Sequence, residues 1–336
     1  MKALVVNCSP GHYNLGAAKL ADWLRSQALD VEAVEGDPGM FALGYDLVAL
    51  SVIFSWHALT AREIALRVKD SCEVWCGGPG VFALARWFRD ETGLDVHRGL
   101  DWRFERQRGD YEMTFASRGC PQGCWWCIVP KAEGLAFSLD WDFVPARILC
   151  DNNLSQLPVD FQEHIIRRYG ESSVPLRDAN SGFEPANLDE ATFRRWEPLL
   201  SRTRAPWRFA FDEERERVEV LRVLRMLGDL PPYRKRVYCL VGHEPIEQCY
   251  DRAITIVAEG GEPFVQHIRQ LNYLGGPWKM RQDWTEKMAI DFQRYWNRYV
   301  WRSAPIWEYR HRKYEPPPFA FLKPGGEARE ADEEVA

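Results

Sequence analysis

The chain has 336 residues, 46% hydrophobic and 27% charged, a composition typical of a folded globular protein rather than a disordered or fibrous one. The formal net charge is −6, and the last twelve residues carry five acids and one arginine, so the remainder of the chain is nearly neutral. Bulk charge therefore predicts no polyanion partner. The nine cysteines are odd in number and mostly scattered, which argues against a secreted disulfide framework and indicates reduced thiols in a cytoplasm.

The sequence predicts no membrane segment. The first residues, MKALVVNCSPG, show no signal-peptide pattern. The most apolar stretch, 41–54, is interrupted by Asp46 and is too short to cross a bilayer. We therefore expect a cytoplasmic protein that does not associate with membranes.

Residues 1–105 predict an α/β domain with a Rossmann-like parallel sheet. Apolar strand patterns alternate with helical patterns, which indicates a parallel sheet covered on both faces. The strands are expected at 2–7, 45–54 and 73–78, and the helices at 15–27, 59–70 and 81–93. Ligands of such sheets bind at the carboxyl ends of the strands, which here are Asn7–Gly11, Ser51–His57 and Cys76–Gly80.

A second alternating series follows a polar stretch at 98–110. Its strands are expected at 111–117, 146–152, 173–179, 208–212, 235–241 and 263–268, with helices such as 189–201 and 216–229 between them. Repeated strand–helix units predict a partial (β/α)6 barrel of the TIM type over 110–272, with its chemistry at the carboxyl ends of the strands.

The pattern changes again at about residue 277, where we predict a helical C-terminal cap over 277–320. Asp283 and Glu286 have capping-box spacing, so a helix is expected to begin there. Its aromatic stripe favours packing as an amphipathic lid, while aromatics interleaved with arginines leave nucleotide or nucleic-acid binding open. The acidic residues 325–336 are expected to be disordered.

The segment SRGCPQGCWWCIVP (117–130) contains Cys120, Cys124 and Cys127 directly after the first strand of the second series. Three thiolates from one loop can ligate three irons of a [4Fe–4S] cluster and leave the fourth iron open. The alternatives are a zinc site and unrelated core thiols. A structural zinc site needs four ligands, and no second cysteine pair follows at the required spacing.

This CxxxCxxC motif, with an aromatic residue before its last cysteine, resembles the radical S-adenosylmethionine (SAM) superfamily. The resemblance implies that the three cysteines ligate the cluster and that its open iron binds the amino and carboxylate groups of SAM. Reductive cleavage then gives a 5′-deoxyadenosyl radical that abstracts hydrogen from a substrate. Trp126 is implied to pack near the adenine, while Trp125 either shields the cluster or packs in the core.

The resemblance covers about residues 110–270 and extends to the subgroup with an N-terminal cobalamin-binding-like domain. It implies that Asp151, Asn152 and Asn153 contact the SAM amino group. The segment NSGFE (180–184) resembles that subgroup's Asn-Gln-Gly-Leu-Asp motif with Ser181 in place of Gln, so Asn180 and Glu184 are implied to bind the ribose or the substrate, and Asp212 lies at the next strand end. The alternative for each of these residues is polar loop capping.

The N-terminal domain resembles the cobalamin domain of this subgroup, and Gly77 and Gly78 would let backbone approach a large cofactor. The Asp-x-His-x-x-Gly signature of some cobalamin proteins is absent, so a domain that keeps the fold without a cofactor is the alternative. The methylthiotransferases are a rival family, because Cys8 and Cys76 follow strands, although Ser55 or Trp56 occupies the place of a third cysteine.

The sequence thus predicts a cytoplasmic radical SAM enzyme with a [4Fe–4S] cluster and SAM as cofactors. Cobalamin would add methyl transfer to hydrogen abstraction. An electron donor such as flavodoxin or ferredoxin is the expected partner, and a nucleotide or nucleic acid is one possible substrate. A non-enzymatic iron–sulfur protein that senses redox state or binds nucleic acid is the alternative of a different class.

Overall fold

The computed structural model describes residues 1–275, 280–281, 283–312 and 315–324 and divides into two compact units. The first contains Met1–Gly182, Thr192–Ala205 and residues 269–275; the second contains Phe183–Ala191, Pro206–Ile268 and the described residues from 280 onward. The predicted domain boundaries at 105–110 and 272–277 stay predictions.

The first unit begins with a four-stranded parallel sheet in the order β2-β1-β3-β4. Its strands are β1 (Lys2–Asn7), β2 (Asp30–Glu35), β3 (Leu47–Ser51) and β4 (Glu73–Gly77). Strands β1, β3 and β4 confirm the α/β prediction. The sequence analysis missed β2, an edge strand whose alternating acids leave it largely exposed.

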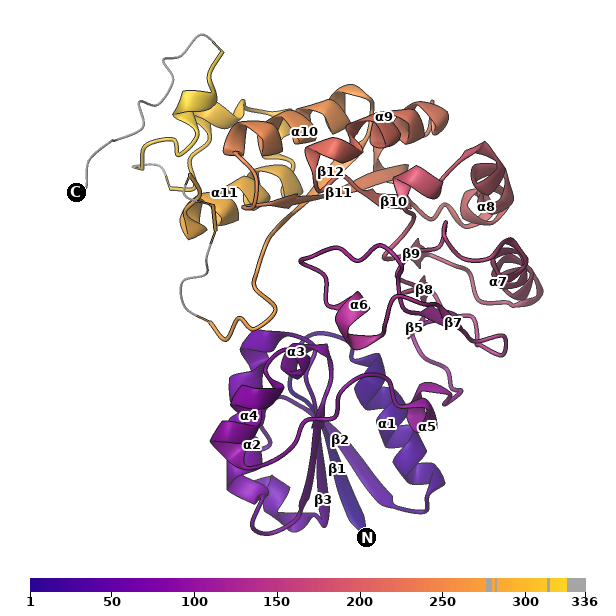
Figure 1. Ribbon diagram of the computed structural model, residues 1–336, viewed down its shortest axis with the longest axis vertical. Coiled ribbons are helices and arrows are strands. Elements are labelled where there is room, and N and C mark those ends of the chain that lie inside the picture. The colour runs from indigo at the N-terminus through magenta and orange to yellow at the C-terminus, as the bar shows by residue number, and fades with distance from the viewer. Residues whose placement is uncertain (276–279, 282, 313–314, 325–336) are drawn as a thin grey trace. The chain divides into compact units, whose positions relative to one another are not determined.

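Alternate residues of β1 face opposite layers. Leu4 and Val6 belong to one apolar cluster, with side chains of α2 (Ala58–Val68), whereas Ala3 and Val5 belong to another, with side chains of α1 (Leu15–Ser26). Helices α1 and α2 accordingly cover opposite faces of the sheet (Figure 1). The helix predicted at 81–93 is broken into α3 (Pro79–Phe82) and α4 (Ala85–Thr92).

The remainder of the first unit holds a short three-stranded parallel sheet in the order β5-β8-β9. Its strands are β5 (Met113–Thr114), β8 (Ile148–Leu149) and β9 (Asp178–Ala179). The predicted strand 111–117 is interrupted, because its end forms β6 (Ser117–Arg118), which pairs antiparallel with β7 (Ser138–Leu139). Four helices complete this part: α5 (Trp102–Glu105), α6 (Val129–Ala132), α7 (Val159–Glu171) and α8 (Glu190–Thr203), whose first two residues belong to the second unit.

The second unit is built on a parallel sheet in the order β10-β11-β12. The strands are β10 (Trp207–Ala210), β11 (Lys235–Val241) and β12 (Glu262–His267), and the helices are α9 (Arg217–Met226), α10 (Ile246–Ala258) and α11 (Glu286–Asn297). The six strands predicted for one barrel therefore form two three-stranded sheets in different units. The mixed α/β architecture is established, and a six-stranded barrel stays a prediction.

Helix α11 lies in the predicted cap, but the predicted cap residue is wrong. Thr285 is the N-cap and its hydroxyl accepts a hydrogen bond from the Met288 amide (3.2 Å), while the Asp283 carboxylate accepts one from the Ile246 amide (3.0 Å). Five of the six members of the predicted stripe are buried, as expected for packing, namely Trp284, Met288, Phe292, Tyr295 and Trp296, whereas the sixth, Tyr299, is 36% exposed. The predicted disordered tail 325–336 and residues 277–279, 282 and 313–314 of the predicted cap lie outside the described residues. No helix in the described parts of the chain has the length and apolarity that a bilayer crossing requires.

Candidate iron–sulfur and SAM site

The three clustered cysteines lie on the loop that joins β6 to α6. Cys120, Cys124 and Cys127 are half-buried thiols. The Cys127 amide donates to the Cys124 carbonyl oxygen (3.1 Å), which forms a tight turn between these two residues. The Val129 amide donates to Cys127 Sγ (3.4 Å), a contact that favours a thiolate there.

Both ends of this loop are joined by hydrogen bonds. The Cys120 amide donates to the Gly134 carbonyl oxygen (3.2 Å), and the Gly119 amide donates to Glu133 Oε2 (2.9 Å). Gly119 has a φ of +91°, and a Cβ added there would lie 2.2 Å from the Ala136 carbonyl oxygen. Glycine is therefore required immediately before Cys120, since any side chain would push the two ends of the loop apart.

The donors of the loop fit an iron–sulfur cluster in chemical kind, since three thiols from one short segment are the usual ligand set. Burial raises the pKa of the Cys127 thiol, and the nearby Cys120 and Glu133 add to this increase. Among the described residues, no three His, Cys, Asp or Glu side chains converge closely enough to hold a metal ion. Cluster binding would therefore require the thiols to draw together and to lose their protons.

The two tryptophans of the loop meet edge to face, with ring centroids 5.2 Å apart. Trp125 is 58% exposed, so the alternative of core packing is wrong for this residue. Its carbonyl oxygen accepts a hydrogen bond from Lys131 Nζ (2.9 Å). Trp126 is half-buried, and its predicted contact with adenine stays a prediction.

Asn152 is the residue of the predicted SAM motif that the structure brings to the cysteine loop. It follows β8, and its Nδ2 donates to the Gly119 carbonyl oxygen (3.2 Å) and to Glu133 Oε2 (2.9 Å). Asn153 instead caps its own turn: its side chain accepts hydrogen bonds from the Gln156 amide and the Ser155 hydroxyl (3.3 Å each). Polar loop capping, the alternative reading, thus describes Asn153.

Asp151 is fully buried and holds the chain at the start of β6. One carboxylate oxygen accepts a hydrogen bond from the Ala116 amide (2.8 Å) and the other from the Ser117 hydroxyl. Burial raises the pKa of Asp151 to about 6, although these donors oppose the shift. The carboxylate therefore has a structural role here, and contact with the SAM amino group stays a prediction.

We expect the buried Asp151 carboxyl to make the protein less stable as the pH rises. Its pKa is higher in the folded chain than the ordinary value of 3.8, so its contribution is fully present below about pH 4 and is lost as the pH passes 6. This increase in the pKa of Asp151 corresponds to about 3 kcal/mol of unfolding free energy. Because Asp212 also has a raised pKa, both proteins lose stability in urea unfolding between pH 4 and 7, but the wild type should lose about this much more than Asp151→Asn. Parallel pH profiles of the two proteins would contradict it.

Asn180 follows β9 and is exposed. Its backbone amide donates to the Leu149 carbonyl oxygen (2.8 Å), and the neighbouring Ser181 hydroxyl contacts the Cys150 carbonyl oxygen (3.5 Å). These contacts continue the pairing of β8 with β9. The predicted role of Asn180 in binding ribose or substrate stays a prediction.

The other two predicted ligand residues, Glu184 and Asp212, belong to the second unit. Asp212 follows β10, and its Oδ1 accepts a hydrogen bond from the Leu240 amide (2.8 Å). Burial raises the pKa of Asp212 to about 7, and the charge of Glu216 adds to the increase. Burial and Glu216 likewise raise the pKa of Glu184. The two predicted residues thus share an acidic group with Glu216, within one unit.

Gly78 does not leave an open approach for a cofactor on the side where a side chain would lie, whereas Gly77 is less crowded. A Cβ added at Gly78 would lie 2.4 Å from the Val52 carbonyl oxygen, and one at Gly77 would lie 3.4 Å from the His97 Cβ. The chain itself therefore fills the space beside Gly78, which serves close packing between the loops that follow β3 and β4. On this observation Gly78 does not fit the backbone approach to a corrin predicted for it, while the same prediction for Gly77 stays a prediction.

The aromatic side chains at the same sheet edge also contact one another. Phe54 stacks on Trp56 with centroids 4.6 Å apart, and the Arg269 guanidinium lies 4.4 Å from the centroid of Trp56. His57 Nδ1 lies 3.0 Å from the hydroxyl oxygen of the buried Ser9. Sequence analysis did not single out this group of contacts.

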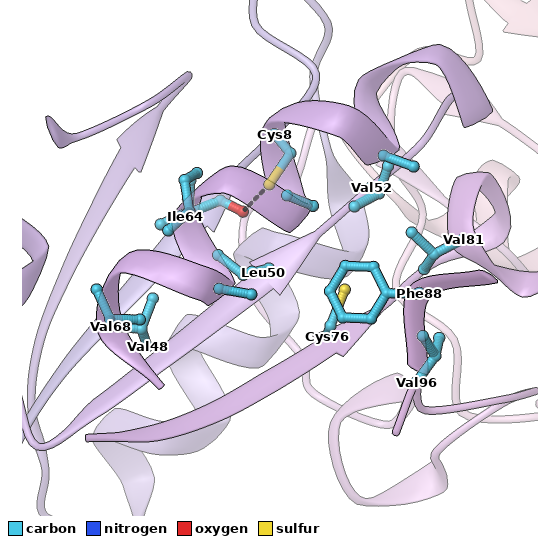
Figure 2. Close-up of a cluster of buried hydrophobic side chains, with 14 of the residues drawn as sticks. Cys8, Val48, Leu50, Val52, Ile64, Val68, Cys76, Val81, Phe88 and Val96 are labelled. Atoms are coloured by element: carbon cyan, nitrogen blue, oxygen red, sulfur yellow. Dashed lines mark hydrogen bonds between the residues drawn. The ribbon is translucent and has the colours of Figure 1, made fainter. Parts of the chain in front are cut away.

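Figure 2 places Cys8 and Cys76 within an apolar core, near side chains such as Val52 and Phe88. Burial raises the pKa of Cys8 to about 12 and that of Cys76 well above its ordinary value. Thiols in such surroundings are poor metal ligands, since the thiolate is the ligand form. This removes the main support for the methylthiotransferase alternative.

Sequence reasoning missed Glu133, which the structure places at the centre of the cysteine loop's contacts. An acid six residues after the last cysteine, in a loop that begins with Arg118, is a weak signal on its own. No family model matches the chain, and no curated protein matches it.

Proposed function

We propose that the protein is a radical SAM enzyme whose Cys120, Cys124 and Cys127 hold a [4Fe–4S] cluster. The observation that supports it is the cysteine loop: three half-buried thiols on one segment, closed at its base by Gly119 and Glu133 and contacted by Asn152 from the SAM motif. A loop closed in this way restricts where the thiols can move and lowers the entropic cost of gathering them round a cluster.

The chain's own contribution is ligation, orientation and the exclusion of water. When bound, the cluster supplies the single electron that cleaves SAM to methionine and a deoxyadenosyl radical. Because the thiols are partly buried, solvent has limited access to the cluster ligands. The hydrogen bond from Asn152 to Gly119 joins the segment after β8 to the start of the loop. Hydrogen abstraction from a substrate C–H bond is the reaction we propose, in a partial (β/α)6 barrel. The remaining predicted ligands of SAM or substrate, Asp151, Asn153, Asn180, Glu184 and Asp212, stay part of the proposal without a contact that singles them out.

The setting we propose is the cytoplasm, with a flavodoxin or ferredoxin as electron donor. Cobalamin-dependent methyl transfer stays a further proposal, with less support, because the chain fills the space beside Gly78. Nucleic-acid binding by the cap has less support than packing, since most aromatic rings of the α11 stripe are buried, although Tyr299 is exposed.

The test is the formation of 5′-deoxyadenosine by anaerobically reconstituted protein with SAM and dithionite. Slow formation is expected without any substrate, and none from protein that was not reconstituted. Gel filtration after incubation with hydroxocobalamin, read by corrin absorbance, decides the cobalamin proposal separately. A reconstituted protein that carries iron and sulfide but leaves SAM intact would favour the iron–sulfur protein without enzyme activity.

A further inference from the structure

Glu133 accepts hydrogen bonds at the point where the two ends of the cysteine loop meet. Its Oε2 accepts from the Gly119 amide and from Asn152 Nδ2, both at 2.9 Å. Its Oε1 lies 3.4 Å from Arg118 Nη1. The side chains of Glu133 and Arg118 are only 13% and 15% exposed, so these contacts are shielded from solvent.

All three partners of this carboxylate are donors. A carboxylate accepts at both oxygens, whereas an amide of the same shape has one acceptor and presents an NH₂ group in place of the other. Hydrogen bonds to a charged acceptor are about twice as strong as those between neutral groups. The position thus needs a carboxylate, and replacing it with glutamine must leave a donor facing a donor.

The contacts also continue away from the loop. Arg118 Nη2 lies 3.2 Å from Glu105 Oε1, and Glu105 in turn accepts at its carbonyl oxygen from the buried Lys19 of α1 (2.6 Å). Glu133 is therefore one end of a line of charged groups that reaches the N-terminal helix. Such a line fixes Arg118, the residue before Gly119, more firmly than a surface ion pair would.

We infer that Glu133 is a positioning residue that fixes Gly119, and with it the backbone of Cys120, at the base of the loop whose thiols would gather round a cluster. The part of this inference that concerns the cluster rests on the proposed function; the part that concerns the loop does not. Glu133 lies at neither a cysteine position nor a predicted SAM-binding position, and it acts only through the residues it holds.

The experiment measures hydrogen–deuterium exchange of the peptide 118–128 in the metal-free protein. Glu133→Gln should raise the exchange rate of the Gly119 and Cys120 amides by about tenfold, the fold-change expected when a charged acceptor is replaced by a neutral one and an NH₂ group faces Arg118. Exchange of β1 should not change. Glu171→Gln is the matched control, because the side chain of Glu171 is 57% exposed and its ion pair with Arg167 (3.3 Å) lies at the surface. Glu133→Asp, which keeps both acceptors, should restore part of the protection.

A second measurement uses the same proteins after anaerobic reconstitution. Glu133→Gln should hold less iron per chain, and the cluster it holds should have a more positive midpoint potential, because a negative charge near Cys127 that disfavours the reduced form has been removed. If the substitution only made the loop more mobile, the protein would lose iron but the midpoint potential of the remaining cluster would not change.

Unchanged exchange in Glu133→Gln would overturn the inference. If that variant does not fold, Asn152→Ala, which removes one donor and keeps the carboxylate, should show a smaller increase at the same amides. If the wild type takes up no iron and sulfide, the proposed function fails, whereas the exchange comparison in metal-free protein still decides the role of Glu133.

Discussion

Replacing any one of Cys120, Cys124 and Cys127 with alanine is expected to abolish SAM cleavage and to remove most of the iron and sulfide from the reconstituted protein. Two thiolates cannot hold a [4Fe–4S] cluster firmly, since three of its irons need protein ligands. The broad absorbance near about 400 nm that such clusters give should disappear as well. The loss should be close to complete rather than partial, because no other cysteine lies on this loop.

The control is Cys72→Ala. Cys72 is also a partly exposed thiol, but it lies in the N-terminal domain, where its Sγ contacts the Val68 carbonyl oxygen (3.5 Å). This variant should keep its iron, sulfide and absorbance. Retention of stoichiometric iron and sulfide by a protein that lacks all three loop cysteines would show that the ligands lie elsewhere.

The second large effect is expected at Gly119. Alanine there would combine a φ of +91° with a Cβ only 2.2 Å from the Ala136 carbonyl oxygen. Backbone strain and overpacking each cost about 1 to 3 kcal/mol, so the unfolding free energy should fall by about 2 to 6 kcal/mol. The displaced backbone also carries the Gly119 amide and carbonyl away from Glu133 and Asn152, so cluster content should fall with it.

Gly123→Ala is the matched control within the same loop. Gly123 also has a positive φ, +63°, but the nearest atom to an added Cβ is Leu135 Cδ2 at 3.8 Å, an ordinary contact. Only the left-handed conformation opposes alanine there, at about 1 to 2 kcal/mol. Thermal or urea unfolding, with iron determination, compares the two variants. Equal losses in both would show that the close approach to Ala136 is not what Gly119 provides.

The strands that carry continuous apolar runs could be predicted from the sequence, because burial on both faces leaves a pattern that needs no partner to be recognised. Strand β1 is such a case, whereas β2, with the sequence DVEAVE, lies at the sheet edge and owes its conformation to pairing with β1. Helix α10 has a readable buried face, at Ile246, Cys249 and Ala253, that the sequence analysis did not single out.

The candidate site was only partly predictable for a related reason. The cysteine spacing is local, so the loop could be recognised directly. Glu133 acquires its role from Gly119 and Asn152, which are 14 and 19 residues away in sequence. No local sequence pattern indicates that these three residues are in contact. Gly78 illustrates the opposite error: a glycine expected beside a cofactor is required by Val52, on the neighbouring loop.

The central claim is that an open iron on the cysteine loop binds SAM. Electron paramagnetic resonance of the reconstituted, dithionite-reduced protein, recorded with and without SAM, tests it most directly. Direct coordination of SAM changes the surroundings of one iron, so we predict a reduced-cluster signal whose g-values shift when SAM is added, and no signal in the variant that lacks all three loop cysteines. A reduced-cluster signal that is identical with and without SAM would contradict the account.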